Sequence, residues 1–142
     1  MIVKNSLLYF LLTIVFISCS KGGGTPANDP IHNTIDPNDS SFPEVVVDTP
    51  TDNQVFANGS TITVTGKVSD NSLYRGSISI TNEANGFVVK DQAYEIHYIP
   101  VYNFSLSYTA SVTAATDFTV TVKFEDHGAN QTVKTVKVKV NP

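Results

Sequence analysis

The sequence predicts an all-β domain in which two sheets pack face to face, and two observations lead to this fold. From Pro43 onward, apolar and polar residues alternate with period two in one stretch after another, whereas no stretch has a convincing helical period. Turn-forming residues separate these stretches at positions 58–59, 70–72, 85–86 and 126–128. About seven strands with one apolar face each are best buried as a sandwich. A closed barrel has similar strand spacing and is the alternative.

The strands are expected where the alternation is clearest, and three stretches stand out. Residues 61–68 place Ile62, Val64 and Val68 on one face, and residues 117–124 and 136–140 repeat the pattern with Phe and Val. Further strands are expected at residues 44–48, 77–81, 87–90, 94–99 and 102–109. Asn85-Gly86 lies between two of them, which is typical of a tight hairpin turn.

The start of the chain has a different character. Lys4 precedes an apolar run from Leu7 to Ile17 that only Thr13 interrupts, and the small Ser18 follows. A basic start, a short apolar run and a small residue are typical of a secretory signal. A membrane-spanning helix is the alternative, but it needs about 20 apolar residues. We therefore expect residues 1–18 to be a signal peptide.

The end of this signal, Phe16-Ile17-Ser18-Cys19, resembles the lipobox of bacterial lipoproteins, with Phe16 where that motif usually has Leu. The resemblance implies cleavage before Cys19 and attachment of the mature chain to membrane lipid through its sulfur. Cys19 is the only cysteine, so the chain cannot form an intramolecular disulfide. An ordinary cleavage site beside a chance cysteine is the alternative.

Residues 20–42 are dominated by Gly, Pro, Asn, Asp, Ser and Thr, and such a segment buries too little surface to order itself. We expect residues 19–42 to form the lipidated cysteine and a disordered, flexible tether, and residues 43–142 to form the folded domain. The chain has 9 basic and 13 acidic residues, and without Lys4 the balance is 8 against 13, a net charge of −5. An acidic surface repels phosphate backbones, so nucleic acid is not expected as a partner.

The domain itself resembles bacterial immunoglobulin-like domains. The resemblance rests on residues 43–50 and 56–70 at its start, and on residues 118–126 and the valine-rich last strand at its end. Together with the signal, the chain is similar to small immunoglobulin-like lipoproteins of Bacteroidota-type bacteria. That resemblance implies a role as an adhesion module, spacer, glycan-binding accessory or assembly subunit. Ser20 after Cys19, in place of Asp, resembles the outer-membrane sorting class of lipoproteins and implies an outer-membrane location, with the periplasmic or surface-facing side left open.

We expect no enzymatic activity and no cofactor. No Ser lies in a Gly-x-Ser-x-Gly turn, and the histidines, His32, His97 and His127, lack the paired spacings of zinc sites. Glu95 and His97 share a face of one predicted strand, which we interpret as an exposed polar face.

Two groups of side chains are weak candidates for binding. Asp70, Asn71, Asp126 and Asn130 offer oxygen ligands for calcium, although Asp and Asn more often bond their own backbone in turns. Tyr94, Tyr98 and Tyr102 have one parity and could stack on a ligand, although Phe104 and Leu106 on the same face favour a core role. The leading hypothesis is a lipid-anchored module that binds a protein or glycan ligand or mediates adhesion. The alternative is a structural spacer or assembly subunit that pairs through a strand edge.

Overall fold

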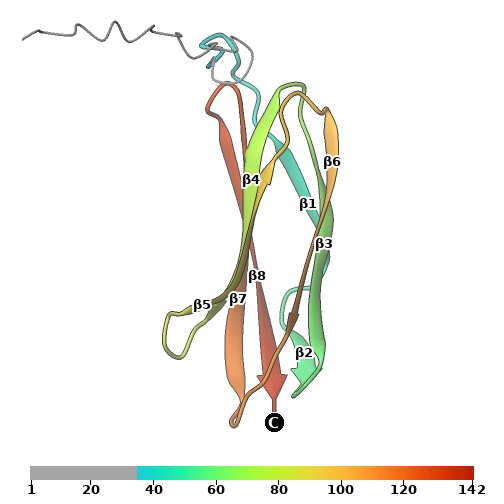
Figure 1. Ribbon diagram of the computed structural model, residues 1–142, viewed down its shortest axis with the longest axis vertical. Coiled ribbons are helices and arrows are strands. Elements are labelled where there is room, and N and C mark those ends of the chain that lie inside the picture. The colour runs from blue at the N-terminus through green and yellow to red at the C-terminus, as the bar shows by residue number, and fades with distance from the viewer. Residues whose placement is uncertain (1–34) are drawn as a thin grey trace, which may run out of the picture.

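The computed structural model describes residues 35–142, which form eight strands in two sheets (Figure 1). The strands are β1 (Glu44–Thr49), β2 (Gln54–Ala57), β3 (Thr61–Ser69), β4 (Leu73–Asn82), β5 (Val88–Glu95), β6 (Val101–Thr109), β7 (Thr116–Asp126) and β8 (Gln131–Asn141). The predicted immunoglobulin-like β-sandwich is therefore confirmed, and the alternative of a closed barrel is wrong. The signal peptide, Cys19 and most of the predicted tether lie outside the described residues. Within residues 35–142, no helix is long and apolar enough to cross a membrane.

The chain alternates between a three-stranded sheet, β1-β3-β6, and a five-stranded sheet, β2-β8-β7-β4-β5. Neighbouring strands are antiparallel except β2 and β8, which run parallel. The chain leaves β1 through a cis Thr49–Pro50 bond and joins the other sheet as β2. Residues 96–100 later carry it from β5 back to β6 in the first sheet. Strands that follow one another in the sequence are thus divided between the two sheets, and the apolar faces of the two sheets pack against each other.

The core lies where the alternation predicts it. The buried residues include Ile62, Val64, Val68, Phe118, Val120, Val122, Phe124, Val138 and Val140. Phe104 and Phe124 stack across the two sheets with ring centroids 5.3 Å apart. Gly76 allows this packing, because a Cβ atom there would overlap the Phe124 ring and lie 2.9 Å from the Lys123 carbonyl oxygen. The strands that the sequence predicts best are therefore those that supply the core.

Three features of the sheets differ from the predictions. Residues 88–95 form one strand rather than parts of two, because they pair with β4 along a sheet edge where neither face is consistently buried. The four-residue β2 was not predicted, since parallel pairing to β8 rather than alternation defines it. The expected hairpin does join β4 and β5, but its loop spans residues 83–87, with Gly86 at a φ of 72°.

Candidate functional site

Three loops gather at the end of the sandwich where residues 35–42 reach it, which we call the N-terminal end (Figure 1). They are the turn at 70–72, the segment at 96–100 and the loop at 127–130. The Asp36 N–H donates to the His127 carbonyl oxygen at 2.8 Å, and the His127 N–H donates to the Ser72 carbonyl oxygen at 2.8 Å. The Asp70 N–H donates to the Pro100 carbonyl oxygen at 3.0 Å. Backbone hydrogen bonds therefore join segments from four parts of the chain, including the described end of the predicted tether.

Three carboxylates meet at this end. Asp39, Asp70 and Asp126 each present an oxygen, and these oxygens lie within 4.8 Å of one another. Asp70 and Asp126 are two of the predicted calcium candidates, whereas Asp39 was missed because it lies in the predicted tether. Asn71 lies exposed in the turn after Asp70. Asn130 directs its amide nitrogen at the Asp126 carboxylate, with Nδ2 donating to Oδ2 at 3.0 Å, so it serves there as a donor rather than as an oxygen ligand.

Each of these carboxylates also accepts a backbone hydrogen bond. The Ser72 N–H donates to Asp70 Oδ1 at 2.8 Å, and the Asn130 N–H donates to Asp126 Oδ1 at 2.8 Å. The Ser41 N–H donates to Asp39 Oδ1 at 2.9 Å. These bonds are the turn chemistry that Asp commonly provides. The interpretation of these residues as turn residues, with calcium ligation as the alternative, stays a prediction.

Two serine hydroxyl groups donate hydrogen bonds to the Asp39 carboxylate and lower its pKa. Ser41 Oγ donates to Asp39 Oδ1 at 2.6 Å, and Ser72 Oγ donates to Asp39 Oδ2 at 2.5 Å. These bonds, the Ser41 hydroxyl foremost, lower the pKa of Asp39 below its ordinary value because they favour the ionised form. Asp39 therefore stays charged beside two other carboxylates, and its bonds hold residues 39–41 against the turn at 70–72.

An aromatic group lies next to the carboxylates and consists of Tyr74, His97, Tyr98 and His127. Tyr98 stacks on His127 with ring centroids 4.2 Å apart and an interplanar angle of 5°. His127 is 4% exposed, whereas Tyr98 is 44% exposed. Tyr74 packs against both histidines, at 5.0 Å from His97 and 4.7 Å from His127, and Arg75 lies 4.9 Å from its ring centroid. The buried imidazole of His127 thus supports a tyrosine ring that reaches the surface.

The backbone that carries Tyr98 is strained. His97 has a φ of 44° and Tyr98 a φ of 56°, which places two successive bulky residues in the left-handed region. Such residues cost about 1–3 kcal/mol each, and they persist only where the surroundings fix them. Here the N–H groups of Ile96 and His97 donate to the Tyr74 carbonyl oxygen, and that of Tyr98 donates to the Leu73 carbonyl oxygen. The bonds to β4 hold the turn that places Tyr98 over His127.

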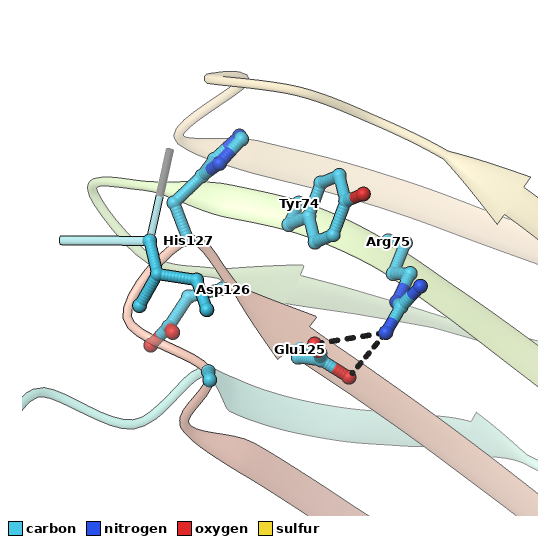
Figure 2. Close-up of a pocket in the computed structure, with 7 residues that line it drawn as sticks. Tyr74, Arg75, Glu125, Asp126 and His127 are labelled. Carbon is cyan, nitrogen blue, oxygen red and sulfur yellow. Dashed lines mark hydrogen bonds and ion pairs between the residues drawn. The ribbon is translucent and has the colours of Figure 1, made fainter. Parts of the chain in front are cut away.

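Two hollows flank His127, and Ile35 lines both. The smaller has a volume of about 170 Å³ and includes Tyr74, Arg75, Glu125 and Asp126 in its lining. Figure 2 shows Arg75 there, with Nη2 3.1 and 3.3 Å from the two carboxylate oxygens of Glu125. The larger has a volume of about 390 Å³ and is lined by Ile35, Asp36, Pro37, Ser72, Tyr98 and His127. The N-terminal end is therefore hollowed on both sides of a buried imidazole.

The three tyrosines that share a parity in sequence have different surroundings. Tyr94 is 7% exposed, and its hydroxyl donates to the Ser105 carbonyl oxygen at 2.8 Å. Burial, with a smaller contribution from Tyr102, raises the pKa of Tyr94. Tyr102 is half-buried and packs edge-on against Tyr94, with ring centroids 5.7 Å apart. Tyr94 and Tyr102 therefore pack with the core. Tyr98 does not, because β5 ends before the left-handed turn that carries it.

Glu95 and His97 do not share a strand face, because β5 ends at Glu95. The left-handed turn brings them together instead, with 3.3 Å between His97 Nε2 and Glu95 Oε2. Lys137 and Lys139 of the last strand occupy its solvated face, where Lys137 pairs with Glu83 at 3.1 Å and Lys139 pairs with Asp117 at 3.4 Å.

Comparisons with known proteins are uninformative about function. No protein-family model matches the chain, and no curated protein matches it. Among solved structures, an engineered protein matches 70% of this chain with a TM-score of 0.48 and 16% identity, and the chain spans 20% of it. The CARDB domain of a Pyrococcus furiosus protein, solved in complex with di-metal ions, is covered to 94%, with a TM-score of 0.45 and 15% identity over 70% of this chain. Fibronectin(III)-like modules of Clostridium thermocellum CbhA are covered to 46%, with a TM-score of 0.43 and 18% identity over 70% of this chain.

Proposed function

We propose that the protein is a lipid-anchored, non-enzymatic immunoglobulin-like module that binds a ligand at the bacterial cell envelope. The anchor is supported by the lipobox-like Phe16-Ile17-Ser18-Cys19 and by the polar segment between it and the domain. Two or more acyl chains on one cysteine give stable membrane attachment, whereas a single chain binds reversibly. The acidic domain would then be held at the membrane without a membrane-binding surface of its own.

The observation that carries the binding role is the display of Tyr98 at the N-terminal end. A strained turn held by β4 and a buried imidazole together present one ring to solvent beside a hollow. Strain of this kind concentrates at functional sites because folding alone gains nothing from it. A non-enzymatic role is supported by the polar groups nearby, since Asp39, Asp70 and Asp126 hold turns and Arg75 pairs with Glu125.

The anchor is tested by substituting Cys19. We expect the wild-type protein and a Ser20→Ala control to sediment with outer membranes and to incorporate an alkyne-labelled fatty acid. We expect Cys19→Ala to incorporate no label and to leave the membrane fraction. A wild-type protein that is soluble and unlabelled would overturn the anchor.

The side of the membrane is tested by protease treatment of intact cells. Cleavage of the wild-type protein on intact cells would assign the surface-facing side, and cleavage only after outer-membrane disruption would assign the periplasmic side. A periplasmic marker protein that stays intact in the first condition is the control.

A further inference from the structure

We propose that the hollow beside Tyr98 binds a pyranose ring of a neutral glycan, with Tyr98 as the stacking surface. This inference rests on the proposed binding function and names its ligand class. The hollow, about 390 Å³, falls within the range of about 300–1,000 Å³ that ligand pockets occupy.

The Tyr98 ring is held rigidly by its neighbours. His127 lies parallel to Tyr98 at 4.2 Å and is itself buried, so it supports one face of the tyrosine ring. The backbone of Tyr98 is fixed by the hydrogen bond of its N–H to Leu73. A ring that is already held in place loses little conformational entropy when a ligand stacks on it. Flat, preorganised aromatic faces suit the C–H face of a pyranose.

The polar residues in and beside the hollow favour a neutral ligand over an anionic one. Asp36 contributes a carboxylate, and apart from His127 the lining contains no basic side chain. Ser72 links the hollow to Asp39 and Asp70, because its hydroxyl donates to Asp39 and its N–H donates to Asp70. Anionic ligands are therefore repelled by three carboxylates, at positions 36, 39 and 70. A carboxylate accepts several hydrogen bonds, and sugar hydroxyls are donors that match it.

The apolar residues of the lining favour a glycan over a cation, which the same carboxylates would attract. Ile35 and Pro37 border the hollow together with Tyr98, so its lining is apolar as well as polar. A pyranose has both apolar C–H faces and peripheral hydroxyl donors, so it matches both kinds of lining residue. A small cation would interact only with the carboxylates and would gain nothing from the apolar residues. The pyranose could belong to a polysaccharide or to the headgroup of a glycolipid, since the chemistry is the same.

The experiment measures ligand contact by saturation-transfer NMR on the full-length protein in a detergent that contains no sugar. The soluble probes are maltohexaose, mannohexaose and chitohexaose, with hexagalacturonate as an anionic probe and tetramethylammonium as a cationic one. A second arm measures binding to phosphatidylcholine vesicles with and without digalactosyl diacylglycerol. The first arm reports a soluble glycan, and the second reports a glycolipid headgroup.

Three variants locate the contact. Tyr98→Gly removes the ring and also relieves the left-handed backbone, because glycine adopts positive φ without strain, so we expect it to fold. Tyr98→Phe keeps the ring. Phe87→Ala removes an aromatic ring that is 70% exposed in the β4–β5 hairpin, and is the matched control. Circular dichroism and melting temperature verify that each variant is folded.

We expect at least one neutral sugar, soluble or in vesicles, to bind wild type, Tyr98→Phe and Phe87→Ala alike. Tyr98→Gly should bind it roughly tenfold more weakly, as for loss of a central aromatic contact. The proposal is overturned if no neutral sugar binds, if only hexagalacturonate or tetramethylammonium binds, or if folded Tyr98→Gly binds like wild type. Failure here would leave the Cys19 anchor intact, because membrane fractionation measures that part of the proposed function separately.

Discussion

Asn130 is expected to be the side chain on which the folded N-terminal end depends most. Its Nδ2 donates to Asp126 Oδ2 at 3.0 Å and to the Asp39 carbonyl oxygen at 3.0 Å, and Asp126 is 1% exposed. Asn130→Ala removes both bonds and leaves one oxygen of a buried carboxylate without its side-chain donor. A lost bond to a charged group costs about 1.5–3 kcal/mol and a neutral one about 0.5–1.5 kcal/mol. We therefore expect the free energy of unfolding to fall by about 3 kcal/mol.

Urea unfolding followed by circular dichroism measures this loss, since the chain has no tryptophan to report it by fluorescence. With an m-value of about 2 kcal/mol/M, the midpoint should shift down by about 1.5 M. Asn103→Ala is the matched control, because Asn103 lies exposed on β6 and surface substitutions usually stay within about 0.5 kcal/mol. A loss below about 1 kcal/mol, or one equal to that of Asn103→Ala, would refute the reasoning.

Two further predictions concern the carboxylates. Because the folded protein lowers the pKa of Asp39, its contribution to stability is complete above the unfolded pKa near 3.8 and is lost as the pH falls through the folded value. Asp39→Asn should therefore lose less stability than wild type between pH 5 and the acid limit in urea melts, and an equal pH dependence would contradict this. The turn interpretation of Asp39, Asp70 and Asp126 predicts the same melting temperature in millimolar calcium and in chelator. A rise in calcium that is absent in Asp70→Asn would instead assign these residues to a cation site.

The sequence predicts those parts of the fold in which one face of a strand is buried and the other is solvated. In β3 and β7 the alternation is strict, and the residues it assigns to the core are buried. It fails in β5, where Lys90, Asp91, Gln92 and Ala93 are all exposed. An edge strand beyond the second layer has no inner environment to impose a pattern, so its pairing with β4 leaves little trace in the sequence.

The candidate site could be predicted only in part, because its geometry depends on contacts between distant segments. Asp70 and Asp126 were identifiable as turn residues, but Asp39 joins them across 31 residues through Ser72. His127 in the last loop supports Tyr98 from an earlier one, and no spacing in the sequence indicates that pairing. Tyr98 was selected by parity, yet its exposure follows from a left-handed turn that non-glycine residues seldom adopt.

The charges on the open strand edges bear on the alternative role as an assembly subunit. β5 ends the five-stranded sheet, and its Lys90 lies opposite Ile80, hence on the face that points toward the core layer. β2 covers only Val138–Asn141 of β8, and in the uncovered part Lys134 lies opposite the buried Val122. A strand added at either edge would pack its inward side chains beside this lysine and partly withdraw the ammonium group from water. Inward-pointing charge is a common protection of sheet edges against pairing. Edge pairing is therefore opposed at these two places of the five-stranded sheet, whereas a ligand at the N-terminal end meets no such cost.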